Sequence, residues 1–118
     1  MQSRRPIYEQ LVAGLSELVS LGVLGPDEQL PSVRTLARDL GVNPNTVQKA
    51  YQELERGGIV YSVAGRGSFI SPGSAASEML RGQALQKIQE AAGEGRRAGL
   101  SREQALAAVA AAYEEERT

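Results

Sequence analysis

Apolar side chains recur with a helical period through the N-terminal half of the chain. After Pro6 they keep this spacing until Gly22, which predicts a first helix. Ser32, a preferred helix cap, precedes a second stripe, which Gly41 is expected to end in the left-handed conformation. The connector between these helices has room for a short strand at Gln29-Leu30. The apolar faces expected are Ile7, Leu11, Leu15, Leu18 and Val19 for the first helix, and Val33, Leu36, Ala37 and Leu40 for the second.

A third helix and a hairpin follow directly. Asn43 is a preferred cap and Pro44 suits the first helical position, so the third helix is expected to begin here. Residues 59–63 and 68–70 are rich in side chains that favour strands, and the glycines within 64–67 suit a turn between them. Three helices and a hairpin in this order predict a winged helix-turn-helix. The inward face of the third helix is expected to be Val47, Ala50, Tyr51 and Leu54.

The composition changes after the turn-forming stretch Ser71-Pro72-Gly73-Ser74. Beyond it the chain is rich in Ala, Glu and Arg, so the predicted domains are 1–72 and 73–118. The fold class predicted is mainly α (α+β), a winged helix-turn-helix followed by a small two-helix segment.

Two helices are expected in the second part. Gly93-Glu94-Gly95 and Gly99 should break the first of them, and Ser101 with Gln104 forms a capping box for the last one. Neither helix can bury its apolar stripe alone, so a second copy of the chain is the expected cover, and a flexible tail is the alternative. The stripe residues expected at a dimer contact are Leu80, Ala84 and Ile88 on the first helix and Leu106, Val109 and Tyr113 on the last.

The composition argues against several classes of function. The 118 residues include no Cys and no His, which removes the commonest metal ligands and the commonest general base, so neither a metal nor a cofactor is expected. The carboxylates of Asp27, Glu28, Asp39, Glu53 and Glu55 form no convincing catalytic pair, and we expect no enzyme. No apolar run is long enough to span a bilayer and no signal peptide is evident, so a cytoplasmic protein without membrane contact is expected. A net charge of −1 argues against non-specific coating of nucleic acid but permits specific binding.

The third helix has a polar outer face once its inward stripe is subtracted. Asn45 and Gln48 carry amides, which can pair in two directions with an adenine edge in the major groove. Thr46 near the helix start can bind a phosphate, and Lys49 is a mobile cation suited to the same group. A solvated polar face is the alternative for any single helix. The turn spacing and the hairpin favour DNA binding.

Three arginines extend this surface. Arg34 and Arg38 lie one turn apart on the second helix, where a guanidinium suits a phosphate or the edge of guanine. For Arg38, pairing with Asp39 or Glu28 is the alternative. Arg66 lies between two glycines at the hairpin tip, from which it can reach a minor groove or a phosphate; a solubilising loop tip is the alternative.

Five ordered motifs, spanning roughly residues 5 to 71, closely resemble the GntR family of bacterial transcription regulators. The motifs are Pro6-Ile7-Tyr8-Glu9-Gln10, Leu30-Pro31-Ser32-Val33-Arg34-Thr35-Leu36-Ala37, Gly41-Val42-Asn43-Pro44-Asn45-Thr46-Val47, Ala50-Tyr51-Gln52-Glu53-Leu54-Glu55 and Gly65-Arg66-Gly67-Ser68-Phe69. The resemblance implies operator contacts at Arg34, around Asn43 to Thr46, at Gln48 and at Gly65 to Gly67. Arg38 and Lys49 are added from their helix faces. The complete set expected at DNA is Ser32, Arg34, Thr35, Arg38, Asn43, Asn45, Thr46, Gln48, Lys49, Gly65, Arg66 and Gly67.

About 46 residues follow Pro72, too few for the large effector-binding or aminotransferase-like domain of most GntR members. A short two-helix tail resembles the YtrA subfamily, in which the resemblance implies a dimerisation role. The function expected is a homodimeric, sequence-specific DNA-binding regulator, a repressor on a two-fold symmetric operator, with any small-molecule effector unidentified. The alternative is a winged-helix protein-interaction module without specific DNA binding.

Overall fold

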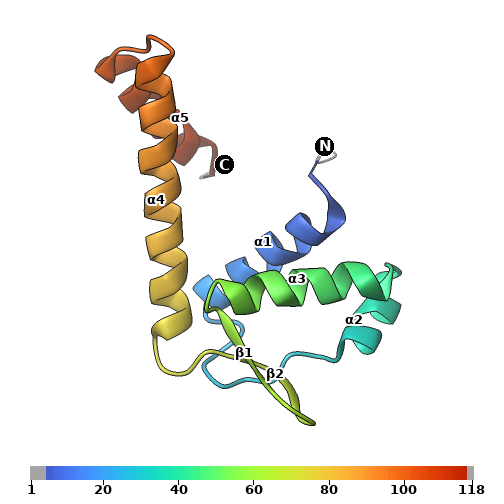
Figure 1. The fold of residues 1–118 in the computed structure, drawn as a ribbon. Helices are drawn as coiled ribbons and strands as arrows, with labels where there is room; N and C mark the ends of the chain where they lie inside the picture. Colours follow the sequence, from blue (N-terminus) through green and yellow to red (C-terminus); the bar gives the residue numbers. More distant parts are fainter. Residues whose placement is uncertain (1–4, 117–118) are drawn as a thin grey trace. The chain divides into compact units, whose positions relative to one another are not determined.

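The computed structural model of the protein describes residues 5–116. Its contacts divide the chain into two units, Met1–Arg81 and Gly82–Thr118. The first unit is a winged helix-turn-helix, and the mainly helical fold class expected from the sequence is confirmed (Figure 1). The elements in chain order are α1 (Ile7–Ser20), α2 (Val33–Leu40), α3 (Pro44–Arg56), β1 (Val60–Val63), β2 (Gly67–Ile70), α4 (Ala75–Arg97) and α5 (Arg102–Glu116).

The helix-turn-helix is formed by α2, a short turn and α3. Both helices begin at the expected caps: the Ser32 hydroxyl accepts a hydrogen bond from the Thr35 amide at 3.0 Å, and the Asn43 side chain accepts one from the Asn45 amide at 2.7 Å. Gly41 ends α2 with a φ of 69°, a left-handed conformation that favours glycine. Local sequence signals therefore determine the length of this turn.

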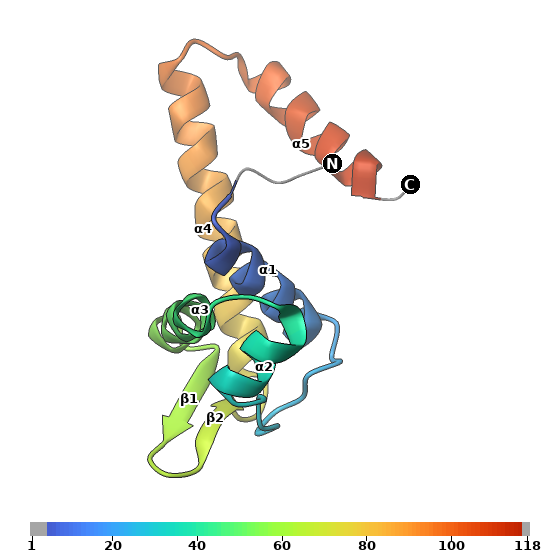
Figure 2. The ribbon, with the colours of Figure 1, turned by 90° about the vertical axis from the view of Figure 1, so that its right-hand side faces the viewer.

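The hydrophobic core lies where α3 packs on α1 and α2 (Figure 2). The predicted inward face of α3 is confirmed, since all four of its residues are buried. Burial of a side chain as large as Leu54 stabilises the fold by roughly 1.5–3 kcal/mol. This packing leaves the opposite side of α3 for solvent or a partner. The buried residues of the cluster are Val19, Leu30, Ala37, Val47, Tyr51, Leu54, Ile59, Val60, Ile70 and Ala76.

The wing is the antiparallel hairpin of β1 and β2, in which Val60 pairs with Ile70 and Val63 with Gly67. The connector between α1 and α2 runs along β2. Its backbone bonds join the Asp27 amide to the Ile70 carbonyl at 2.8 Å and the Leu30 amide to the Ser68 carbonyl at 2.8 Å. The short strand expected in the connector is present as a single bridge between Gln29 and Phe69.

The predicted break at Gly93-Glu94-Gly95 is wrong, because α4 continues through it to Arg97. Glycine inside a helix costs only about 1 kcal/mol relative to alanine, which the bonds of adjacent turns offset. The helix ends at Arg97, and Gly99, two residues later, has a φ of 96°. There the Leu100 amide bonds the Gly95 carbonyl at 2.9 Å, and the Gly99 amide bonds the Arg96 carbonyl at 3.1 Å. A positive φ combined with these two bonds determines the end of α4, whereas glycine content alone does not.

The beginning of α4 belongs to the first unit. Ala76 is buried in its core, and Leu80 packs partly buried against the same cluster. The division by contacts therefore falls after Arg81, later than the boundary expected after Pro72. Independent folding of residues 1–72 stays a prediction.

In the second unit, α5 begins with the predicted capping box. The Gln104 side chain accepts a bond from the Ser101 amide at 2.8 Å, and the Ser101 hydroxyl accepts one from the Gln104 amide at 3.1 Å. The stripe residues expected in this unit stay exposed: Leu106 is 57% and Tyr113 is 68% accessible, and Ala84, Ile88 and Val109 are exposed as well. An apolar stripe on each helix thus has no cover within the described chain.

No helix within residues 5–116 combines the length and the apolar character that crossing a membrane requires.

Candidate DNA interface

The start of α3 presents polar groups on a rigid base. Val47 and Ala50 are buried, so Asn45, Gln48 and Lys49 are directed to the outside and are exposed. Thr46 is half-buried, and its amide is bonded to the Asn43 carbonyl at 2.9 Å. The arrangement matches the polar face expected from the sequence, and its amide side chains are available for hydrogen bonding to base edges.

The beginning of α2 lies beside this face because Tyr51 joins the two helices. The Tyr51 side chain is buried and its hydroxyl donates to the Pro31 carbonyl at 2.8 Å, one residue before the α2 cap. Ser32 and Thr35 share a further bond between their hydroxyls at 2.9 Å. These contacts hold the cap of α2, with Arg34 exposed on its first turn, at a fixed place relative to α3.

Burial raises the pKa of Tyr51 to about 12. In the unfolded chain a tyrosine titrates near 10, so the folded state holds this proton more tightly. The resulting stabilisation is complete below about pH 10 and is lost as the pH rises toward about 12.

Tyr51→Phe is expected to lower the free energy of unfolding by about 1 kcal/mol at pH 9, because the bond to Pro31 is lost. The variant should also lose less stability than the parent between pH 9 and pH 11, as it has no proton to release. Urea unfolding at both pH values measures this. Tyr113→Phe, at an exposed position, is the matched control; an equal fall for Tyr51→Phe and the parent would contradict the assignment.

Arg34 and Arg38 are both exposed, but their surroundings differ. Arg38 Nε lies 3.7 Å from Asp39 Oδ1, which is the local pairing that the sequence left open. Both side chains are largely exposed, and such pairs contribute little free energy, so Arg38 can leave Asp39 for a phosphate at small cost. Within residues 5–116, no ion pair engages Arg34.

Lys49 has a partner that the sequence reasoning missed. Its ammonium lies 4.1 Å from the centre of the Tyr8 ring, a cation–π contact between α3 and α1. Tyr8, Lys49, Asn45 and Thr46 line a shallow open groove together with the start of α1. Tyr8 belongs to the Pro6-Ile7-Tyr8-Glu9-Gln10 motif, but the sequence predicted no contact for its side chain. The contact places the Lys49 charge beside the first turn of α3.

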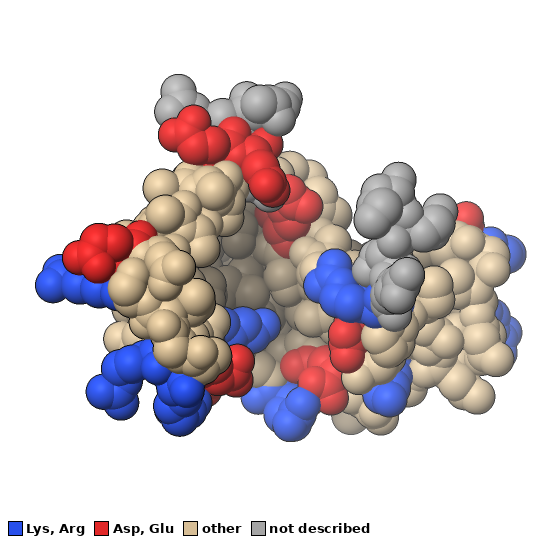
Figure 3. Space-filling model, turned by 90° about the horizontal axis from the view of Figure 1, so that it is seen from above, with Lys and Arg blue, Asp and Glu red and all other residues tan. Residues whose placement is uncertain are grey.

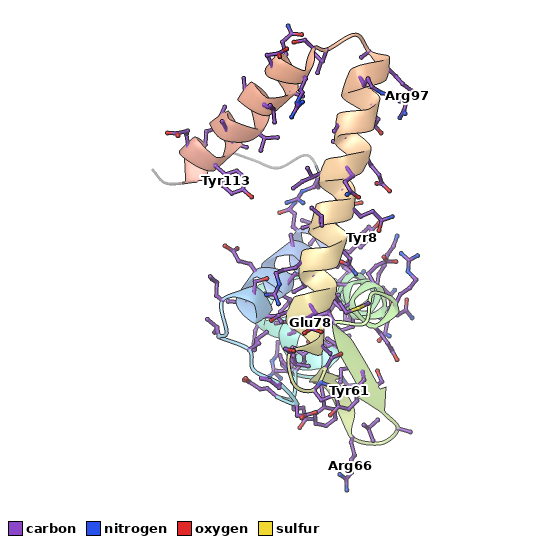
Figure 4. All side chains as sticks on the ribbon, turned by 90° about the vertical axis from the view of Figure 1, so that its left-hand side faces the viewer. Tyr8, Tyr61, Arg66, Glu78, Arg97 and Tyr113 are labelled. Atoms are coloured by element: carbon purple, nitrogen blue, oxygen red, sulfur yellow. The ribbon has the colours of Figure 1, made fainter. Side chains whose placement is uncertain are left out.

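The wing tip presents Arg66 away from the body of its unit (Figure 4). Gly65 and Gly67 on either side have φ values of 78° and 116°, which side chains other than glycine rarely adopt. The Arg66 carbonyl accepts a bond of 2.6 Å from the Gln29 side chain. Gln29 was missed by the sequence reasoning, because the two residues are brought together only by the pairing of the connector with β2.

Gly67→Ala is expected to destabilise the protein by about 2 kcal/mol. A Cβ at this position would lie 2.9 Å from Gln29 Nε2, so the Gln29 bond would be lost in addition to the backbone strain. Gly65→Ala is the matched control, since its Cβ would meet no atom within 4 Å and only the strain applies. Chemical denaturation compares them; equal losses for the two variants would show that the Gln29 contact adds nothing.

Charge of both signs is distributed over the surface seen in Figure 3. Within the described range, Asp and Glu side chains do not gather into any group that could hold a metal ion. The candidate DNA interface consists of amide, hydroxyl and arginine side chains, which come from the beginnings of α2 and α3 and from the tip of the wing. This is chemistry for recognising a nucleic acid duplex.

Comparison with protein families supports this interpretation. The model of a family described as bacterial regulatory proteins, gntR family, matches residues 7–70. This range covers more than half of the chain, from the start of α1 to the end of β2. The protein belongs to the GntR family.

Individual relatives place this GntR protein among the YtrA-like members. It is 51% identical to the HTH-type transcriptional repressor YtrA of Bacillus subtilis strain 168 over 70 residues, which are 59% of the chain. That match spans 54% of the repressor's own length. A GntR family transcriptional regulator from Listeria monocytogenes has a similar structure, with a TM-score of 0.70 and 32% identity, covering 92% of this chain and 96% of the other.

Several similar structures contain operator DNA. The DNA-binding domain of AraR, solved in complex with operator ORR3, matches with a TM-score of 0.56 and 31% identity over 60% of this chain and 86% of its own. The fold of the winged unit is thus one that binds operator DNA in a relative. In this GntR protein the residues expected at DNA all belong to that unit.

Proposed function

We propose that this protein is an operator-specific transcription regulator that binds DNA as a homodimer and acts as a repressor. The observation that carries the proposal is the exposed polar first turn of α3, held beside the exposed Arg34 of α2 and in one unit with the wing tip. The operator complex of the AraR domain supports this use of the winged unit.

The side chains divide by the chemistry of their partners. Asn45 and Gln48 read base edges in the major groove, where an amide pairs with adenine in two directions. Arg34 binds guanine or a phosphate with its forked guanidinium. Thr46, Lys49 and Arg38 bind phosphates and fix the register of the protein on the duplex. Arg66 reaches the backbone or the minor groove from the wing.

Dimerisation is proposed through the apolar side chains of the two tail helices. Ile88, Leu106 and Val109 are exposed, and a second copy would cover them. Leu80 is already partly covered by the core of its own unit, so its contribution should be the smallest. A two-fold dimer would place two copies of α3 in successive major grooves, about 34 Å apart. The name of the Bacillus relative, a repressor, supports regulation by occupancy of a promoter.

Selection of binding sites from random duplexes tests the proposal. The expected result is an inverted repeat with half-sites about one helical turn apart. Affinity for the selected duplex should fall as salt rises, because phosphate contacts release counterions. If no duplex is enriched and binding is absent at low salt, the proposal is overturned in favour of a protein-interaction module.

A further inference from the structure

The connector between α1 and α2 binds the wing through side-chain hydrogen bonds as well as through its backbone. At the base of the wing, the Tyr61 hydroxyl donates to Asp27 Oδ1 at 2.7 Å, and the Tyr61 ring stacks on Phe69 with centroids 5.5 Å apart. Figure 4 shows Tyr61 on the hairpin and Arg66 at its tip. Asp27 itself adopts a φ of 62°, a conformation that Asp tolerates better than most residues. The base of the hairpin is therefore anchored to the body of the winged unit.

Gln29 makes the corresponding contact at the tip. Its side-chain amide donates to the Arg66 carbonyl at 2.6 Å, across 37 positions of sequence. A Cβ at Gly67 would lie 2.9 Å from this amide nitrogen, so a side chain there would displace it. The glycine thus makes room for the Gln29 bond.

We propose that Gln29 is a positioning residue for DNA binding: by holding the Arg66 carbonyl, it fixes the direction in which the wing tip presents the Arg66 guanidinium. The inference rests on the proposed function, since it concerns how that interface is organised. Gln29 belongs to none of the residue sets expected to contact DNA, and it acts through Arg66.

The physical reason is the weakness of an isolated hairpin tip. A two-stranded hairpin is marginally stable, and glycines on both sides of Arg66 increase its conformational freedom. If the Arg66 side chain and its backbone become ordered only when DNA binds, the lost conformational entropy reduces the free energy of binding. The Gln29 bond restricts the backbone at Arg66 before binding, and so reduces that loss.

A double-mutant cycle on the full chain tests the proposal. Gln29→Met keeps the length of the side chain and removes the donor, and Arg66→Ala removes the guanidinium. Affinity for the selected duplex is measured at several salt concentrations for the parent, both single variants and the double variant. Gln86→Met, whose side chain bonds Glu90 in the second unit, is the matched control.

Arg66→Ala is expected to weaken binding about tenfold and to make the salt dependence less steep, because one phosphate contact is lost. Gln29→Met should weaken binding about fivefold in the parent and shift the salt dependence in the same direction. In the Arg66→Ala background Gln29→Met should have no further effect. An equal loss in both backgrounds, or no loss in the parent, would overturn the proposal.

Hydrogen exchange on the free protein separates this inference from the proposed function. The Arg66 amide is bonded to the Val63 carbonyl at 2.9 Å, and its exchange should be about fivefold faster in Gln29→Met if Gln29 holds the tip. Unchanged exchange would refute the positioning role, even if the parent binds DNA. If the parent binds no duplex, the proposed function fails, and faster exchange would leave Gln29 with a role in wing order alone.

Discussion

Arg34→Ala is expected to weaken binding to the selected operator by about 2 kcal/mol per half-site, or roughly 30-fold. Arg34 is exposed on the first turn of α2, whose cap is held beside α3 by Tyr51. Its guanidinium can therefore form a two-pronged contact with a guanine or a phosphate. Electrophoretic mobility shift with the selected duplex and with a random duplex gives both affinities.

The comparison of the two duplexes distinguishes the roles of Arg34. If it reads a base, the variant loses affinity for the operator far more than for random DNA; if it binds a phosphate, both affinities fall alike. Arg56→Ala is the matched control, because it removes the same charge from the far end of α3, where Arg56 pairs with Glu53. Helical content should be unchanged in both variants. Normal operator binding by Arg34→Ala would exclude Arg34 from the interface.

Leu106→Glu is expected to convert the proposed dimer to a monomer and to reduce operator affinity at least about 100-fold. Leu106 is 57% exposed in the single chain, so the substitution removes little packing within the chain and places a charge on the apolar face of α5. A dimer gains affinity because its second half-site binds at a high effective concentration, and a monomer loses this gain. Sedimentation velocity and operator titration measure the two effects.

Ala107→Glu is the control for this experiment. It adds the same charge at the neighbouring exposed position, off the stripe of Leu106, Val109 and Tyr113. This variant should stay dimeric and bind normally. A dimeric Leu106→Glu protein, or a monomeric one with full operator affinity, would show that the tail stripe is not the required interface.

Signals that act over a few residues were predictable from the sequence. Ser32, Asn43 and Gly41 determine the turn of the helix-turn-helix through capping bonds and one positive φ. The period of apolar positions identified the buried face of α3, because a helix packed on one side must bury such a stripe. Subtracting that face left polar residues of which Asn45, Gln48 and Lys49 are exposed in the structure and Thr46 is half-buried.

Contacts between distant residues were not predictable in this way. The pairing of Lys49 with Tyr8 depends on how α1 crosses α3, and the bond between Gln29 and Arg66 depends on the connector pairing with β2. The start of α4 joins the first unit because Ala76 and Leu80 find apolar partners there. The partners in each of these contacts are far apart in the sequence, so no pattern of neighbouring residues predicts them.

The sequence by itself determined the winged helix-turn-helix, the turn that separates its two helices and the polar face of α3, because capping, backbone conformation and helical period are local properties. The tertiary structure alone decided that Gln29 bonds the Arg66 carbonyl at the wing tip and that the start of α4 packs into the core of the first unit. A bond between the connector and the wing, or a core contact of α4, exists only once folding has brought these distant segments together. For this protein, local chemistry therefore specifies which groups face outward, and packing between distant segments specifies how firmly they are held.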